Sequence, residues 1–90
     1  MEGIFIFVCD RGHVFVGRAE IHSRLALHWH LPVSRTIRQW GTKDGLAQLK
    51  DGPTKDTILD APVERSTPFR SVIDILHITE KGEKAWAKSL

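Results

Sequence analysis

Two apolar runs at the start of the chain predict a β-hairpin. Residues 4–8 read Ile-Phe-Ile-Phe-Val and residues 14–16 read Val-Phe-Val, and both are rich in the β-branched and aromatic side chains that favour strands. The polar break between them contains Gly12, which can adopt the positive φ that a tight turn requires. We expect the second strand to end, or to begin a bulge, at Gly17 and Arg18.

Alternation in residues 25–31 (Leu-Ala-Leu-His-Trp-His-Leu) predicts a third strand with one apolar and one polar face. A helix is the rival interpretation, because Ile21, Leu25 and Trp29 are also spaced four apart. Pro32 and the regular alternation favour the strand.

The middle of the chain predicts a further strand followed by a short helix. Residues 33–40 include three β-branched side chains and are followed by Gly41, which fits a strand paired with the preceding one. Thr42 or Asp44 can cap a helix over residues 46–50, which the Gly52-Pro53 pair ends.

After this helix, the pattern predicts two more extended segments. Residues 57–59 are expected to form a brief strand, and residues 60–62 (Asp-Ala-Pro) a break. Pro68 fits only an edge or irregular position, because proline has no backbone N–H to donate. Residues 71–78 predict a mostly buried strand in which Asp74 is the unusual polar member.

The end of the chain predicts a helix over residues 80–89. Thr79 can cap it, acidic side chains stand in its first turn, and lysines follow later. Gly82 is expected to weaken this helix, and Trp86 is expected to face the sheet.

These elements predict one α+β domain over residues 1–90 that is mainly β. The expected architecture is a small, strongly bent antiparallel sheet or open barrel of about five to six strands, with one short central helix and a C-terminal helix. The residues expected to form its turns and core are Gly12, Trp29, Trp40, Gly41, Gly45, Gly52, Pro53 and Trp86.

Composition is that of an ordinary globular domain, with 90 residues, 41% of them hydrophobic and 27% charged. The longest apolar run, residues 4–9, is far shorter than the ~18–20 apolar residues of a membrane-crossing helix. Because the chain also begins without the features of a signal peptide or lipid anchor, we expect a cytoplasmic protein. Cys9 is the only cysteine, and its apolar strand indicates a buried thiol rather than a reactive one.

Basic side chains are concentrated between residues 11 and 43. The whole chain has a formal charge of +2, but this stretch holds six arginine or lysine residues against Glu20 alone. Such a face can attract nucleic acid or an acidic protein surface, although a solvated face without a partner is the more ordinary interpretation. The candidate contacts to phosphate or to an acidic partner are Arg18, Arg24, Arg35, Arg38 and Lys43.

Trp40 is a candidate for stacking on a base, because it stands among these basic residues. Its position next to Gly41, at the junction of strand and turn, favours packing under the following helix instead. Trp29 and Trp86 are expected in the core for similar reasons.

His28 and His30 are weak candidates for a metal site, because residues two apart on a strand point to one face. His13 or His22 can supply a third ligand, but neither a pair of cysteines nor a nearby acidic cluster completes a site. We therefore expect a polar strand face, with neither a metal nor another cofactor.

Catalytic motifs are missing from the sequence. The chain contains neither a GxSxG elbow, nor a glycine-rich phosphate loop, nor an HExxH pair. We therefore expect a protein that is not an enzyme and infer no small-molecule substrate.

One pattern of residues extends through the middle of the chain. It consists of Arg38 to Thr42, Gly45, Leu46, Leu49, Gly52 to Thr54, Thr57, Leu59 and Asp60. This pattern resembles that of a family of small uncharacterised proteins found in tailed phages, prophages and some bacterial genomes. The resemblance implies a phage or prophage setting and brings no activity, cofactor or catalytic residue with it.

Two hypotheses of different classes follow. In the first, the protein is a non-enzymatic interaction or structural module that docks a sheet face or edge to another protein. Its partner would be a phage assembly component or a second copy of the chain, in the cytoplasm or in the virion. In the second, it is a small β-barrel that binds nucleic acid through the basic face of residues 11–43. Binding to phosphates would weaken steeply with added salt, whereas apolar docking would not.

Overall fold

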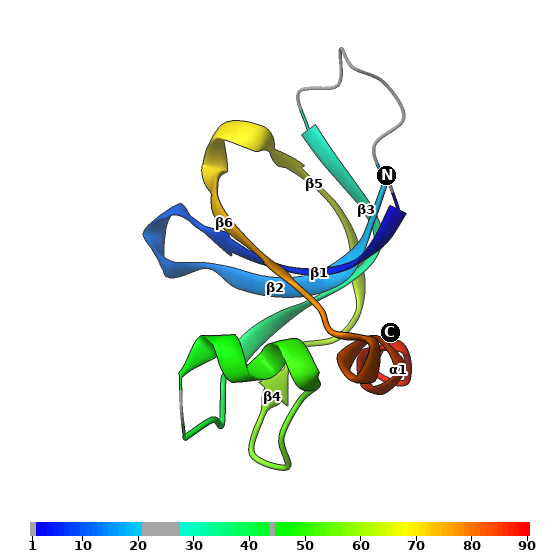
Figure 1. The fold of residues 1–90 in the computed structure, drawn as a ribbon. Helices are drawn as coiled ribbons and strands as arrows, with labels where there is room; N and C mark the ends of the chain where they lie inside the picture. The colour runs from blue at the N-terminus through cyan, green and yellow to red at the C-terminus, as the bar shows by residue number, and fades with distance from the viewer. Residues whose placement is uncertain (1, 21–27, 44) are drawn as a thin grey trace.

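The computed structural model describes residues 2–20, 28–43 and 45–90 (Figure 1). Its strands are β1 (Glu2–Cys9), β2 (Val14–Glu20), β3 (His28–Gln39), β4 (Ile58–Leu59), β5 (Val63–Pro68) and β6 (Val72–His77). One α-helix, α1 (Glu80–Ala87), follows the last strand, and three short 3-10 segments are η1 (Asp10–Gly12), η2 (Leu46–Asp51) and η3 (Phe69–Ser71). This arrangement confirms the predicted small, mainly β domain with an open antiparallel sheet.

All six strands belong to one antiparallel sheet with the order β4-β3-β2-β1-β6, and β5 pairs with β3 off this path. The long strand β3 pairs with β5 through its first half and with β4 through its last residues. The sheet bends strongly, so that β5 and β6, which η3 joins, curve over one of its faces (Figure 1).

The predicted hairpin at the start of the chain is confirmed. Strands β1 and β2 pair in register from Glu2↔Glu20 to Val8↔Val14. The turn places both Arg11 and Gly12 at positive φ, 60° and 78°, and Gly12 is the residue that does so without steric cost.

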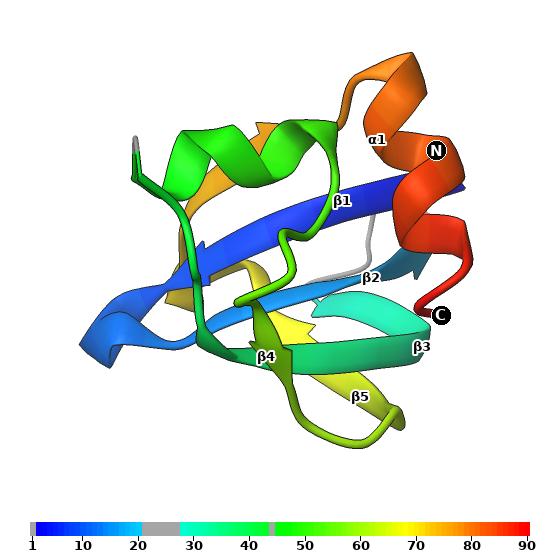
Figure 2. The same ribbon diagram turned by 90° about the horizontal axis from the view of Figure 1, so that it is seen from below.

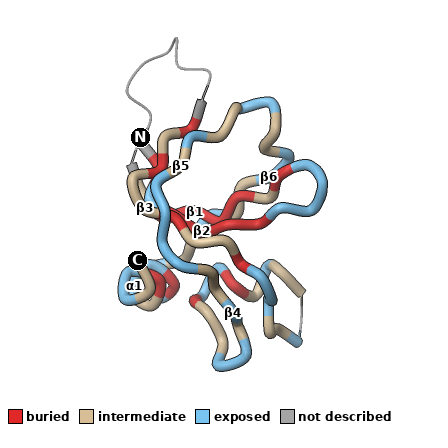
Figure 3. The backbone as a smooth tube through the Cα atoms, turned by 180° about the vertical axis from the view of Figure 1, so that it is seen from behind, coloured by how far each residue is buried: buried red, intermediate tan, exposed pale blue. Residues whose placement is uncertain are grey.

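Alternation along these strands divides the core into two clusters. One face of the sheet is aliphatic, with Ile4, Ile6, Val14, Val16 and Ile37, together with Leu49 from η2 and Trp86 from α1. The other face is aromatic, with Phe5, Phe7, Phe15, Trp29 and Leu31, together with Cys9 and Ala19. In Figure 3 the buried positions are most frequent along β1 and β2, and others lie on β3, η2 and α1.

The aliphatic face is covered by η2 and α1, which lie on the same side of the sheet (Figure 2). Thr79 caps α1 as predicted, because its hydroxyl accepts a hydrogen bond from the Gly82 N–H at 3.1 Å. Trp86 is fully buried, and its indole Nε1 donates to the Leu49 carbonyl at 2.8 Å. This bond ties the C-terminal helix to η2.

Pro32 does not end a strand, so the predicted division into two paired strands is wrong. Residues 28–39 form the single strand β3, and Pro32 lies where its register shifts against both β2 and β5. An irregularity of this kind tolerates proline, since the missing N–H is then not needed by the ladder.

The last part of the sheet also differs from expectation. Strand β5 was not predicted. Among the described strands it is an edge strand that ends at Pro68, a position that fits the prediction for this proline because proline has no backbone N–H to donate. Strand β6 was expected to be mostly buried, but it pairs only with β1 among the described strands. Half of its residues are exposed, including Ile73 at 68% exposure.

Trp40 was expected in the core, and this prediction is wrong. Its side chain is 42% exposed, because Leu49 and Trp86 fill the apolar space beneath η2. The predicted central helix forms as the 3-10 segment η2, which begins after Gly45 without a side-chain cap, so Thr42 does not cap it. Asp44, the other predicted cap, lies outside the described residues. Neither α1 nor any other described helix is long and apolar enough to cross a membrane.

Candidate functional site

Arg35 was predicted as a phosphate contact, but the fold uses its guanidinium internally. Its Nε donates to the Asp60 carbonyl at 2.6 Å, and its Nη1 donates to the Ser89 carbonyl at 3.2 Å. Both bonds are partly buried, and they fasten the segment between β4 and β5 and the residues after α1 to β3. Arg35 therefore has a structural role.

The other predicted basic contacts do not gather into one site. Arg38 is 70% exposed, but its Nη2 lies 2.7 Å from the Asp60 carboxylate. Arg18 is exposed opposite Val33, which is five strand residues, or about 17 Å, from Arg38. Lys43 is exposed in the loop beyond β3. Arg24 lies outside the described residues.

The threonines and glycine of the Arg38–Asp60 pattern join two loops after β3. The Thr54 hydroxyl donates to the Gly41 carbonyl at 2.7 Å, and the Thr57 hydroxyl donates to the Trp40 carbonyl at 2.6 Å. Gly41 has φ of 67°, and a Cβ there would overlap the backbone of Asp56. Gly41, Thr54 and Thr57 therefore share a structural role, because together they hold two loops in backbone contact.

An open groove of about 610 Å³ lies over these two loops. It is lined by Gln39, Gly41, Thr42, Lys43, Gln48, Thr54, Lys55 and Asp56. The carboxylate of Asp56 offsets part of the charge of the two lysines, and none of the charged residues in the lining is buried. The groove therefore offers polar contacts and one excess positive charge that is exposed to solvent.

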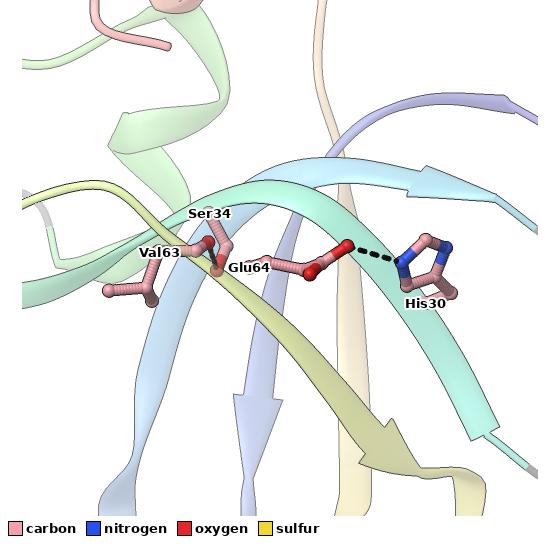
Figure 4. A network of polar contacts seen from close by, with 4 residues as sticks. All are labelled: His30, Ser34, Val63 and Glu64. Atoms are coloured by element: carbon pink, nitrogen blue, oxygen red, sulfur yellow. Dashed lines mark hydrogen bonds and ion pairs between the residues drawn. The ribbon is translucent and has the colours of Figure 1, made fainter.

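The two histidines proposed for metal do not form a metal site in the described residues. The His30 Nε2 lies 3.1 Å from the Glu64 carboxylate, across β3 and β5 (Figure 4). His28 begins β3, but its side chain lies outside the described ones. Within residues 2–20, 28–43 and 45–90, no three potential ligands come together.

Exposed apolar side chains gather on the segment β5-η3-β6, residues 63–77, which we call the rim. Five large apolar side chains of the described residues are exposed, and the rim holds three, namely Val63 (46%), Phe69 (36%) and Ile73 (68%). Ile73 is the extra residue of a β-bulge, since Val8 pairs with Asp74 and Cys9 with Val72. The bulge therefore turns a branched apolar side chain outward at a sheet edge.

Arg65, on strand β5 of the rim, lies against the aromatic cluster. The Arg65 guanidinium stands over the Phe15 ring, 4.5 Å from its centroid. From Phe15 the rings continue through Phe7 (5.2 Å) and Trp29 (5.3 Å) to Phe69 (5.2 Å). A cation thus stands at one end of an aromatic row and a partly exposed ring at the other.

None of the rim residues was a candidate in the sequence analysis. The alternation of Val63, Arg65 and Thr67 with polar neighbours is a signal for a strand, but the prolines at 62 and 68 obscured it. The position of Arg65 over Phe15 leaves no signal in the sequence, because it depends on a pairing between distant strands.

Comparison with known proteins identifies no relative. The chain matches no family model, no curated protein and no solved structure.

Proposed function

We propose that this protein is a non-enzymatic interaction module that docks another protein along its rim. The observation that carries the proposal is the contrast between the two faces of the sheet. The aliphatic face is covered by η2 and α1, whereas Val63, Phe69 and Ile73 stay exposed on the rim. Apolar side chains grouped at sheet edges are typical of protein interaction surfaces.

The strand edges of the rim support this proposal. In the described sheet, β5 pairs only with β3, and β6 pairs only with β1. Each therefore has an edge whose N–H and C=O groups are available to an added strand. An extended segment of a partner can combine such backbone bonds with apolar contacts to Phe69 and Ile73.

The setting belongs to the proposal as well. The resemblance of the Arg38–Asp60 pattern to phage and prophage proteins supports a phage assembly component as the partner, in the cytoplasm or the virion. Nucleic-acid binding has weaker support, because Arg35 bonds to two carbonyls and Arg38 to Asp60.

Selection from a displayed library of random peptides tests the proposal. Peptides that bind the wild-type protein are expected to lose at least about tenfold in affinity to Ile73→Asp and Phe69→Ser. Trp40→Ser is the matched control, because it also removes an exposed large apolar side chain, away from the rim. The affinity of the peptides for this control is expected to stay unchanged. In the wild-type protein, peptide binding is expected to slow amide hydrogen exchange in β6.

Two outcomes would contradict the proposal. One is a selection whose peptides depend on Trp40 and not on the rim. The other is tight binding to DNA or RNA fragments that weakens steeply between about 50 and about 300 mM salt, as phosphate contacts require.

A further inference from the structure

Arg65 is held by neutral groups on the inner side of the rim. Its Nε donates to the Ser34 hydroxyl at 2.6 Å, and its Nη2 donates to the Thr36 hydroxyl at 3.0 Å. Its guanidinium also covers the Phe15 ring. None of these partners carries a negative charge.

This situation differs from that of Arg35 and Arg38, the two arginines of β3. Arg38 pairs with the Asp60 carboxylate, and Arg35 donates to two backbone carbonyls. In the part of the chain that the structure describes, no carboxylate forms an ion pair with Arg65. Burial lowers the pKa of its guanidinium, while Cys9 and the Asp60 carboxylate, which lies beyond ion-pair distance, act in the opposite direction. A partly buried cation without a directly paired counter-charge can gain from an added anion.

The hydrogen bonds of Arg65 leave one edge of the guanidinium open. Ser34 and Thr36 occupy the edge formed by Nε and Nη2. The Nη1 group donates to none of the described residues, so the edge formed by Nη1 and the second Nη2 proton remains. Two parallel N–H groups on such an edge match the two oxygens of a carboxylate.

The guanidinium is also fixed in place before any ligand arrives. Ser34 is fully buried, and its hydroxyl donates to the Val63 carbonyl at 3.0 Å (Figure 4), so its lone pair is directed at Arg65. The Phe15 ring supports the plane of the guanidinium, and Phe7 stacks on Phe15 at 5.2 Å. A side chain held in this way loses little conformational entropy on binding.

We propose that Arg65 anchors a carboxylate in an extended segment of the partner protein. This inference rests on the proposed docking function and specifies the chemistry of the occupant. Arg65 and Phe69 are four residues apart, so they are separated by at most about 14 Å. The segment therefore carries an acidic side chain and an apolar one about two or four residues apart, because residues at these spacings share one face of an extended strand.

Nuclear magnetic resonance of the arginine Nε–H groups tests the anchor without a known partner. Acetate is the probe, and acetamide and sodium chloride are the controls. The Arg65 resonance is expected to shift and saturate with acetate alone, whereas that of Arg70, an exposed arginine on the same rim, shifts only weakly and linearly. An Arg65 resonance that follows Arg70 would overturn the inference. Inorganic phosphate that binds at least about tenfold more tightly than acetate would also overturn it, by indicating a phosphoryl ligand.

A pair of blocked peptides tests the spacing. Ac-Glu-Thr-Val-Thr-Leu-NH2 is expected to bind the wild type about five- to tenfold more tightly than its Gln counterpart. This preference is expected to fall to about twofold or less in Arg65→Lys, which keeps the charge but lacks the forked edge, and to persist in Arg70→Gln. Equal binding of both peptides by the wild type would refute the anchor. Selected peptides that depend on Ile73 but ignore Arg65 would refute this inference alone and leave the docking proposal in place.

Discussion

The two faces of the sheet are closed in different ways. The protein's own η2 and α1 cover the aliphatic face, and their polar groups bond to one another, as Trp86 does to the Leu49 carbonyl. The aromatic face is enclosed by the curvature of the sheet, with Arg65 and Phe69 at the two ends of its row of rings. The aliphatic face is thus covered by other segments of the chain, whereas the aromatic face borders the partly exposed rim.

This difference separates stability from recognition. Side chains under η2 and α1 are buried on all sides, so changing them opens cavities in the core. Side chains of the rim such as Ile73 have most of their surface in water already, so changing them costs the fold little. The side chains of the rim that would contact a partner can therefore change without unfolding the domain.

The largest expected effect comes from Trp86→Ala. This change removes a fully buried indole together with its hydrogen bond to the Leu49 carbonyl, so we expect a loss of about 3–5 kcal/mol in the free energy of unfolding. Urea unfolding measures it. Trp86→Phe keeps most of the apolar contact and should lose about 1–3 kcal/mol, through the smaller ring and the lost indole hydrogen bond; the Leu49 carbonyl still accepts from the Gly52 N–H at 3.0 Å. Ile73→Ala should change stability by no more than about 0.5 kcal/mol. An Ile73 variant as unstable as Trp86→Ala would end the distinction between the two faces.

Gly82→Ala provides a test with an unusual sign. In an exposed helix the same change stabilises by about 0.5–1 kcal/mol. Here the added Cβ would overlap the Lys50 carbonyl oxygen, because α1 packs directly on the backbone of η2. We therefore expect destabilisation by about 1–3 kcal/mol in urea unfolding. Glu83→Ala, at an exposed position of the same helix, is the control, with an expected change within about 0.5 kcal/mol. A stabilised Gly82 variant would show that the two segments are not in close contact.

Features of the fold that depend on neighbours in sequence could be predicted. The hairpin around Gly12 follows from two short apolar runs and a turn residue, and the cap at Thr79 follows from local helix signals. Pro32 shows the limit of such signals, because whether a proline ends a strand depends on the partner strands. Gly82 shows it too, since its role comes from a contact with Lys50.

The candidate site was less predictable than the fold. Arg35 and Arg38 were predicted as contacts because arginines are common in basic patches, but Asp60, more than twenty residues away, binds both of them. Arg65 was not predicted, because its hydroxyl partners Ser34 and Thr36 reach it only through the pairing of β3 with β5. Charge composition indicates how many cations a chain has, whereas topology decides which of them remain available.

The smallest expected effect concerns Cys9, which lies on the aromatic face and is 4% exposed. Burial raises the pKa of its thiol above the ordinary 9.0, the Asp10 carboxylate adds to this, and Arg65 opposes it. Above about pH 9 the unfolded thiol therefore ionises while the folded one keeps its proton, so stability falls as pH rises, with a limiting slope of about 1.4 kcal/mol per pH unit.

Urea unfolding of the wild type and of Cys9→Val between about pH 7 and about pH 10.5 isolates this contribution, because other titrating groups are common to both proteins. The wild type should lose stability relative to the variant only in the alkaline part of the range. A difference that stays constant up to about pH 10.5 would mean that water reaches the thiol, and that the aromatic face is more open behind Arg65 than its burial indicates.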